Sequence, residues 1–325
     1  MDDAGLNIDV LMRDLGRQAR GAAAALRSAP TEARTAAIVA MARAVRSSVA
    51  GILAANADDL AAGRRAGLTD ALLDRLALSE ARVEAIAAGL DAIAGIPDPV
   101  GAEIARWTRP NGLDIARVRT PIGVIGVIYE SRPNVTADAA ALCVRSGNAV
   151  ILRGGSESLR SSLAIHAALE EGLREAGLPE AAVQIVPVAD RAAVGAMLSG
   201  LDRSIDLLIP RGGKSLVARV QQEARVAVLG HLEGLCHVYV HAGAEADKAR
   251  AIVANAKMRR VSVCGAAETL LIDTTIAPRL LEDLAATLRG LGCERAQCIG
   301  WQQMVRGSDN RDIASPQEWQ GNDRG

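Results

Sequence analysis

One cysteine in the sequence has the neighbours that a catalytic thiol requires. Cys264 follows two arginines, Arg259 and Arg260, and directly precedes Gly265. Basic neighbours favour the thiolate, which is the form of cysteine that attacks a carbonyl carbon. A lone cysteine is also often a small buried hydrophobic residue. The residues around Cys264 leave both interpretations open.

Two turns of the sequence contain an arginine followed by two glycines, and each lies between a predicted strand and a predicted helix. They are Arg153-Gly154-Gly155 and Arg211-Gly212-Gly213. Glycines at such a turn let backbone N–H groups approach a phosphate, and the N-terminus of the following helix favours negative charge. The side chain of Arg153 adds a forked donor suited to a ribose phosphate. An ordinary tight turn is the alternative at both places. A Walker A loop at the second turn is excluded, because Leu208 stands where its first glycine is needed.

An asparagine stands at the predicted start of a helix. Asn134 directly follows Pro133. Its side chain can cap the helix by accepting a hydrogen bond from a backbone N–H. It can instead donate to the oxyanion that develops when a nucleophile attacks a carbonyl group. The sequence around Asn134 does not decide between these roles.

The cysteines and histidines predict reduced thiols and no metal site. The five cysteines are scattered along the chain: Cys143, Cys236, Cys264, Cys293 and Cys298. They form no CxxC pair, and no histidine completes the spacing of a zinc site. The four histidines are interpreted as structural. We therefore expect a cytoplasmic protein.

The composition is that of a globular protein with neither a nucleic-acid nor a membrane partner. The chain has 325 residues, of which 50% are hydrophobic and 23% are charged, and this length predicts two domains. A formal net charge of −1 gives no field to attract nucleic acid or anionic lipid. The longest apolar run, residues 121–129, is about half as long as a bilayer span requires. No secretory signal is expected at the N-terminus.

The pattern of apolar residues predicts an α/β fold with a doubly wound parallel sheet, which would position these turns. Residues 1–101 are expected to be helical, and residues 102–120 to form a two-stranded hairpin around Asn111-Gly112. From residue 121, short apolar segments alternate with helical patterns. The predicted strands are 122–128, 149–152, 183–186, 205–209, 226–229, 236–240 and 269–273, and the predicted helices are 134–146, 156–176, 190–199, 213–224, 245–257 and 277–291. Residues 294–325 show no periodicity and are interpreted as an irregular tail.

Several long segments, in one order, are similar to the γ-glutamyl phosphate reductases, a branch of the aldehyde dehydrogenase superfamily. They include PIGVIGVIYESRPNVT at 121–136, SGNAVILRGG at 146–155, DLLIPRGG at 206–213, EGLCHVYV at 233–240 and NAKMRR at 255–260, followed by Cys264. The resemblance covers residues from about 5 to 293. It implies an NADPH-dependent oxidoreductase of proline biosynthesis. Such an enzyme reduces L-glutamate 5-phosphate to L-glutamate 5-semialdehyde and releases phosphate.

The resemblance also implies a role for each candidate residue. Cys264 corresponds to the nucleophile, which would form a thioester, and Asn134 to the asparagine that binds the oxyanion. The turn at 153–155 corresponds to the segment that holds the adenosine ribose, and the turn at 211–213 to the glycine turn under the cofactor pyrophosphate. His231 stands where related dehydrogenases have a water-activating glutamate. That departure suits an enzyme whose acyl acceptor is phosphate rather than water.

The resemblance divides the chain into four segments. Residues 1–101 and 121–239 would form an NADPH-binding domain, 102–120 an oligomerisation hairpin, 240–293 part of a catalytic domain and 294–325 the tail. Beside the small-molecule substrate glutamyl phosphate, a homo-oligomer and a contact with glutamate 5-kinase are expected. Family sequences continue past the end of this chain, and nothing after Cys293 resembles them. The alternative interpretation is therefore a truncated, catalytically dead remnant of the same enzyme.

Overall fold

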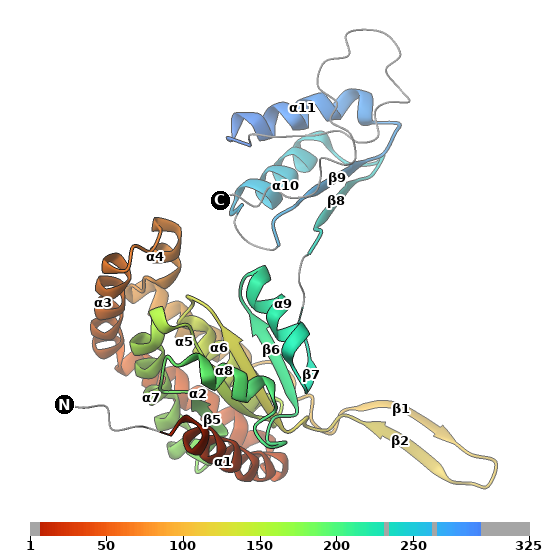
Figure 1. The fold of residues 1–325 in the computed structure, drawn as a ribbon. Coiled ribbons are helices and arrows are strands. Elements are labelled where there is room, and N and C mark those ends of the chain that lie inside the picture. The colour runs from red at the N-terminus through yellow and green to blue at the C-terminus, as the bar shows by residue number, and fades with distance from the viewer. Residues whose placement is uncertain (1–6, 231–233, 262–264, 294–325) are drawn as a thin grey trace. The chain divides into compact units, whose positions relative to one another are not determined.

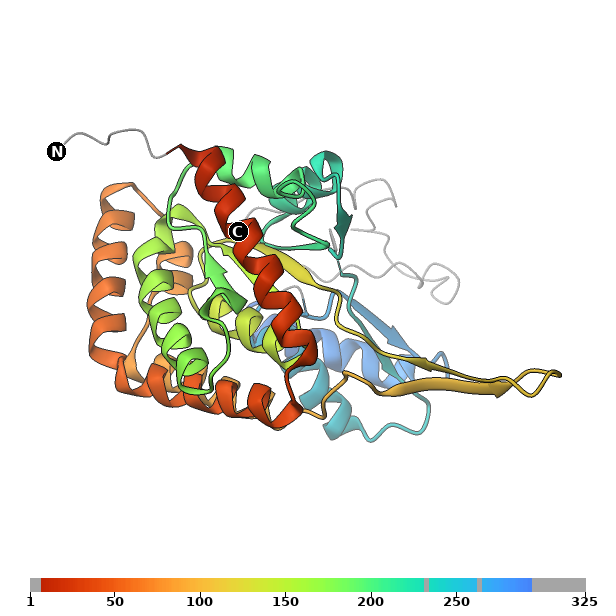
Figure 2. The same ribbon diagram turned by 90° about the horizontal axis from the view of Figure 1, so that it is seen from below.

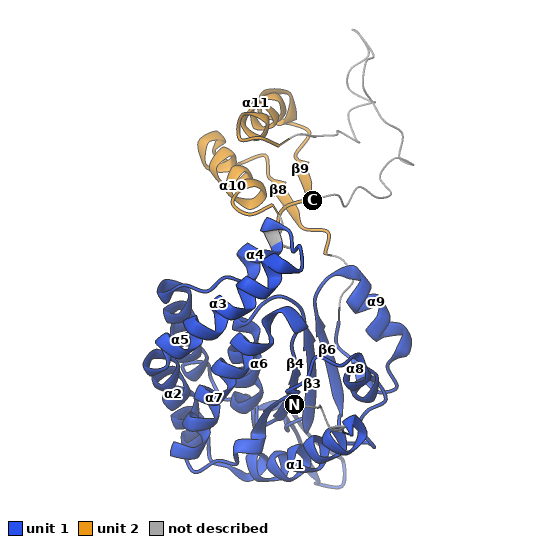
Figure 3. Cartoon of the chain, turned by 60° about the vertical axis from the view of Figure 1, so that its left-hand side comes forward, with its two compact units in different colours: residues 1–232 blue, residues 233–325 orange. Residues whose placement is uncertain are grey.

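The computed structural model describes residues 7–230, 234–261 and 265–293. Two units, residues 1–232 and 233–325, each have their own sheet and their own apolar core (Figure 3). The predicted boundary between residues 239 and 240 falls inside strand β8 (His237–Val240). That strand pairs with β9 (Thr269–Ile272) of the second unit. The boundary is therefore corrected to the segment before β8.

The first unit is built on a five-stranded parallel sheet with the order β5-β4-β3-β6-β7 (Figure 1). Its strands are β3 Val124–Tyr129, β4 Ala149–Arg153, β5 Val183–Ile185, β6 Leu207–Arg211 and β7 Ala227–Val228. Every residue of β3 is buried, as expected for a parallel strand whose two faces are both covered. Of these five strands β3 comes first in the chain, and β4 and β6 lie on opposite sides of it. This reversal of strand order creates the crevice at which doubly wound sheets bind ligands.

Helices cover both faces of this sheet. Helices α6 (Asn134–Arg145) and α7 (Leu159–Glu175), with α2 and α5 outside them, lie over one face, and α1 (Ile8–Ser28) and α8 (Arg191–Leu198) lie over the other (Figures 1 and 2). The other helices of the unit are α2 Thr31–Ser47, α3 Val49–Arg65, α4 Asp70–Leu76, α5 Glu80–Ala94 and α9 Lys214–Glu223. A Cβ on Gly172 of α7 would lie 2.4 Å from the backbone nitrogen of Met41 in α2. Such close helix packing suits a chain with only 2% aromatic residues.

The predicted helix starts and stops are confirmed at several positions. Thr69 caps α4 and Ser79 caps α5 through their side-chain hydroxyl groups. Gly67 and Gly177 follow α3 and α7 with φ values of +75° and +69°, a conformation that glycine adopts without strain. Every strand and helix predicted after residue 121 occurs, with ends that differ by a few residues at most. The helix predicted at 156–176 begins as a 3-10 turn, Ser156–Ser158.

The predicted hairpin is present. Strands β1 (Glu103–Thr108) and β2 (Asp114–Val118) pair antiparallel and extend away from the sheet of the first unit (Figure 1). Ile104, Trp107 and Leu113 are 52%, 40% and 57% exposed. The role of this hairpin in oligomerisation stays a prediction.

The second unit contains a two-stranded parallel sheet and two helices. Strands β8 and β9 pair with each other, and α10 (Ala246–Met258) and α11 (Ala277–Gly290) pack with them around Val240, Val253 and Leu284. Cys264 and the tail at 294–325 lie outside the described residues, so the predictions for them stay predictions. Across the described residues no single helix is both long and apolar enough to cross a membrane. Helices α2 and α3 reach that length and composition only as a pair, with a bend of 68° between them.

Candidate active site

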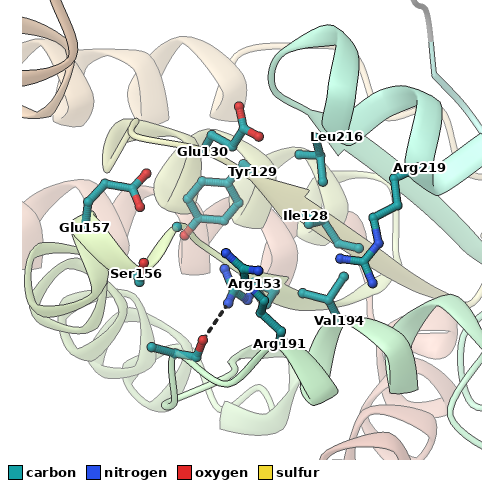
Figure 4. A pocket seen from close by; sticks show the side chains of 12 residues that line it. Ile128, Tyr129, Glu130, Arg153, Ser156, Glu157, Arg191, Val194, Leu216 and Arg219 are labelled. Atoms are coloured by element: carbon teal, nitrogen blue, oxygen red, sulfur yellow. Dashed lines mark hydrogen bonds between the residues drawn. The ribbon is translucent and has the colours of Figure 1, made fainter. Parts of the chain in front are cut away.

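The candidate site lies at the carboxyl ends of β3, β4 and β6. Arg153 ends β4 level with Ile128 of β3, and Arg211 ends β6 level with Tyr129. The two Arg-Gly-Gly turns therefore flank the end of the same central strand. A cavity of about 210 Å³ lies here, between the strand ends and helices α8 and α9 (Figure 4). Its lining includes Ile128, Tyr129, Glu130, Arg153, Gly155, Glu157, Arg191, Val194, Leu216 and Arg219.

The guanidinium group of Arg153 is held in place by backbone carbonyl oxygens. Its Nη1 donates to the Gly154 oxygen at 2.6 Å, and its Nη2 donates to the Ala189 oxygen at 3.0 Å. Its Nε is buried and has no hydrogen-bond partner among the described residues. Burial lowers the pKa of Arg153, and the charge of Glu157 opposes that shift. A partly desolvated guanidinium with an unused donor is suited to bind an anion.

Glu157 connects the turn after β4 to the loop after β3. Its Oε1 accepts hydrogen bonds from the backbone N–H and the hydroxyl of Ser131, at 2.8 and 2.6 Å. Ser131 has a φ of +40°, a value that costs free energy for a residue with a side chain. Gly155 leaves room for the Glu157 carboxylate, because a Cβ on it would lie 2.2 Å from Oε1. Glu157 thus shapes both loops, although no motif in the sequence pointed to it.

A carboxylate occupies the start of α9, at the second Arg-Gly-Gly turn. Glu130 Oε2 accepts the backbone N–H of Gly213 at 2.9 Å. Gly212 leaves room for this carboxylate, because a Cβ on it would lie 2.7 Å from Oε2. Helix N-termini attract anions through their free N–H groups and the helix dipole. The second turn therefore has the geometry expected of a phosphate site, with Glu130 in the place of the anion.

The first turn differs, because a buried carboxylate from another helix already occupies the N-terminus of α7. Asp59 of α3 is 3% exposed. It accepts hydrogen bonds from the backbone N–H and the hydroxyl of Ser161, at 2.8 and 2.7 Å. The Ser161 N–H therefore already has an acceptor, and phosphate binding at the first turn stays a prediction. An anion at the first turn would be bound by the side chain of Arg153 instead.

Asn134 does not cap α6, so that interpretation is wrong. It is the first residue of the helix, after Pro133 at the N-cap position, and its side chain makes no capping hydrogen bond. Its Nδ2 donates to Asp138 Oδ2 at 3.0 Å. Burial raises the pKa of Asp138, and the hydrogen bond from Asn134 and the charge of Arg211 oppose that shift. An amide has a second N–H to donate, and its use in binding an oxyanion stays a prediction.

Cys143 is excluded as an alternative nucleophile. It is buried in α6, and burial raises its pKa to about 12. A thiol with that pKa carries almost no thiolate at neutral pH. The predicted nucleophile Cys264 lies outside the described residues, as does His231. No cluster of three His, Cys, Asp or Glu side chains that could hold a metal ion occurs in the described part of the chain.

The residues at this edge of the sheet fit a nucleotide cofactor. Arg153 lines the cavity and has a buried Nε without a hydrogen-bond partner among the described residues, and Gly212 leaves space beside the start of α9 that a Cβ would fill. A cavity at the switch point of an open α/β sheet is the usual place for a ligand in such folds. The family model described as the aldehyde dehydrogenase family matches residues 13–298. The chain belongs to the aldehyde dehydrogenase family and, within it, to the γ-glutamyl phosphate reductases. It is therefore an oxidoreductase of a family that uses a nicotinamide cofactor.

Three relatives show how far this similarity extends. The γ-glutamyl phosphate reductase of Caulobacter vibrioides is 67% identical over 283 residues, which cover 87% of this chain and 68% of that protein. The reductase of Parvibaculum lavamentivorans is 56% identical over 310 residues, covering 95% and 71%. The crystal structure of the Thermotoga maritima reductase matches with a TM-score of 0.84 at 38% identity, covering 95% and 73%. The predicted family and fold class are confirmed.

Proposed function

We propose that the chain catalyses the NADPH-dependent reduction of L-glutamate 5-phosphate to L-glutamate 5-semialdehyde, the second step of proline biosynthesis. The observation that carries this proposal is the 67% identity over 283 residues to a relative named γ-glutamyl phosphate reductase. That name specifies an acyl phosphate as the relative's substrate. The arginine-lined cavity at the sheet edge supports a phosphate-bearing cofactor.

Cys264 is the proposed nucleophile. Its thiolate sulfur bonds to the acyl carbon of the substrate, the bond between that carbon and the phosphate oxygen breaks, and phosphate leaves with the electron pair. A thioester on Cys264 remains. Negative charge on the acyl oxygen during the attack is stabilised by the amide of Asn134 and the backbone N–H of Cys264. The hydrogen bond from Asn134 to Asp138 supports this role. Because a carboxylate can only accept a hydrogen bond, the NH2 group of the Asn134 amide must be the end that faces Asp138.

The chain's own residues hold the cofactor that completes the reaction. When bound, a reduced nicotinamide would supply a hydride to the thioester carbon. The carbon–sulfur bond would then break, which releases the aldehyde and returns Cys264 to the thiolate. In this proposal Arg153, with Gly154 and Gly155, binds the ribose phosphate that distinguishes NADPH from NADH. The turn at 211–213 binds the pyrophosphate.

A steady-state assay tests the reaction. The chain is mixed with NADPH and glutamyl phosphate generated by an ATP-dependent kinase, and NADPH oxidation and phosphate release are followed together. We expect one phosphate released for each NADPH oxidised. Cys264→Ala should abolish both while NADPH still binds. Cys143→Ala should keep the rate within about tenfold, equivalent to about 1.4 kcal/mol of barrier. Equal losses in the two variants would contradict the assignment of Cys264.

A second candidate function is cofactor binding without turnover, as in a remnant of the same enzyme. One observation favours it: among the described residues of the second unit, β8 and β9 pair only with each other. A sheet of two strands is marginal on its own, and Tyr239 and Leu271 on it are 58% and 47% exposed. NADPH binding with no oxidation of NADPH, in a folded sample, would select this function.

A further inference from the structure

Three arginines and two glutamates line the cavity at the sheet edge, but the carboxylates are not paired with the two arginines nearest its centre. Figure 4 shows Arg153 and Arg191 side by side in the cavity, with Glu130 and Glu157 farther out. Glu157 accepts from Ser131 and Glu130 from the Gly213 N–H. Within the part of the chain that the structure describes, neither Arg153 nor Arg191 has an ion pair. Arg153 and Arg191 therefore keep N–H donors that no described carboxylate occupies, although the charge of Glu157 acts on Arg153 without a direct contact.

Arg153 by itself cannot neutralise a dianion. Two of its five N–H donors are already used on the Gly154 and Ala189 carbonyl oxygens. A phosphate monoester carries a charge of about −1.5 to −2 at neutral pH, whereas one guanidinium supplies a single positive charge. A site that binds such a group tightly needs a second cation or further donors.

Arg191 is placed to be that second cation. It is the first residue of α8, two residues after Ala189, the residue whose carbonyl oxygen holds Arg153. Arg191 is exposed, lines the cavity and makes no hydrogen bond through its side chain within the described residues. Burial lowers the pKa of Arg153, and the positive charge of Arg191 lowers it further. Among the described residues, neighbouring Asp190 makes no ion pair with Arg191; Asp190 Oδ1 accepts the Ala192 N–H at 2.8 Å, and its charge acts on Arg153. Two like charges that line one cavity repel each other, and an anion bound by both would reduce that repulsion.

The third arginine is less suited to this role. The Nε of Arg219 on α9 lies 3.0 Å from Glu223 Oε2 and 3.1 Å from Oε1. Its charge is therefore compensated within its own helix. Arg219 enters the cavity from the side opposite the Arg153 turn (Figure 4).

We infer that Arg191 is a second specificity-determining residue for NADPH, whose guanidinium binds the 2′-phosphate together with that of Arg153. This inference rests on the proposed function, because only a cofactor with a 2′-phosphate places a dianion beside the ribose. The substrate of the proposed reaction brings a second terminal phosphate group, in its acyl phosphate. The experiment must therefore separate the two sources.

Binding of cofactor fragments tests the inference without turnover. The probes are adenosine 2′,5′-bisphosphate, which carries the 2′-phosphate, and 5′-AMP, which lacks it. Their dissociation constants are measured by calorimetry for the full chain, for Arg191→Gln and for Arg225→Gln. Arg225 is a matched control: it is exposed, its backbone N–H donates to Leu198 at the other end of α8, and its side chain makes no hydrogen bond in the described residues. Acetyl phosphate, as an acyl phosphate, is added as a competitor.

Arg191→Gln should raise the dissociation constant of adenosine 2′,5′-bisphosphate about tenfold and change that of 5′-AMP by less than about twofold. Arg225→Gln should change neither. An unchanged bisphosphate affinity in Arg191→Gln, equal losses for both probes, or displacement of the bisphosphate by acetyl phosphate would each overturn the inference. If the unaltered chain binds both probes equally, the proposed preference for NADPH fails, and this inference fails with it. If the unaltered chain prefers the bisphosphate and Arg191→Gln keeps that preference, the inference alone fails.

Discussion

The turns at 153–155 and 211–213 have the same three residues and flank the same strand, but they meet different surroundings. After the first turn, the N-terminus of α7 is filled by Asp59, which is 3% exposed. After the second turn, the N-terminus of α9 is filled by Glu130, a partly exposed residue from the end of β3. A buried carboxylate is costly to move, whereas one at the surface can be exchanged for another anion.

The two arginines differ in the same way. Arg153 is partly buried, and two carbonyl oxygens fix its guanidinium. Arg211 is exposed. Its positive charge lowers the pKa of Asp138, in opposition to burial, which raises it. A fixed, desolvated guanidinium discriminates between ligands, whereas an exposed one contributes attraction that solvent screens. The comparison teaches that residues distant in the sequence decide what an Arg-Gly-Gly turn can bind.

The largest expected effect concerns Asp59. Asp59→Ala removes the acceptor of two hydrogen bonds and leaves the Ser161 N–H buried without a partner. We expect the free energy of unfolding to fall by about 2–4 kcal/mol, measured by denaturant titration. The neighbouring Asp58 is exposed, and Asp58→Ala is the control, expected to change stability little. NADPH affinity should not change in folded Asp59→Ala. A large change in affinity with unchanged stability would mean that the N-terminus of α7 takes part in binding.

The next largest effect separates the two arginines. Arg153→Ala should weaken the binding of NADPH several-fold or more, because a charge-assisted contact in a partly desolvated site contributes about 1.5–3 kcal/mol to binding. NADH should be little affected. Arg211→Ala should weaken both cofactors alike and by less than about fivefold, since exposed charge pairs contribute about 0.2–1 kcal/mol. Fluorescence titration of both cofactors measures this. If Arg153→Ala weakened both cofactors equally, Arg153 would be holding the loop at Ala189 rather than binding a phosphate.

The fold could be predicted because its signals are local. The buried strand at 149–152 and the strand at 183–186 are each short apolar runs, and the structure places them at Ala149–Arg153 and Val183–Ile185. Helix signals such as Ser79 and Gly177 act within a few residues of their own position. The similarity to a known family added the prediction that the turns at 153–155 and 211–213 bind one cofactor.

The surroundings of the turns could not be predicted in this way. Asp59 and Ser161 are 102 residues apart, Glu130 and Gly213 are 83 apart, and Arg153 and Ala189 are 36 apart. No spacing rule connects residues at such separations, because only the packed sheet brings them together. Arg191 was missed for a related reason. It lies in none of the five segments quoted for the resemblance, and its signal appears only in the cavity that it lines.

The smallest expected effect tests whether Glu130 stands in the place of an anion. Glu130→Gln removes the negative charge at the start of α9 but keeps an oxygen that can accept the Gly213 N–H. If the cofactor pyrophosphate displaces this carboxylate, its removal should strengthen binding. A charge at a helix N-terminus contributes about 0.3–1 kcal/mol, so the dissociation constants should fall about two- to fivefold. NADPH and NADH should gain equally, because both carry the pyrophosphate, in contrast to the discrimination expected of Arg153 and Arg191.

A second helix provides the control for Glu130. Glu32 also stands in the first turn of a helix in this unit, α2, is exposed and does not line the cavity. Glu32→Gln should therefore leave both dissociation constants unchanged. Weaker binding of both cofactors by Glu130→Gln would show that the carboxylate organises the turn for the ligand instead of competing with it. In that case the two Arg-Gly-Gly turns would be alike in depending on a fixed glutamate, Glu157 for the first and Glu130 for the second. The contrast between them would then lie in their arginines alone.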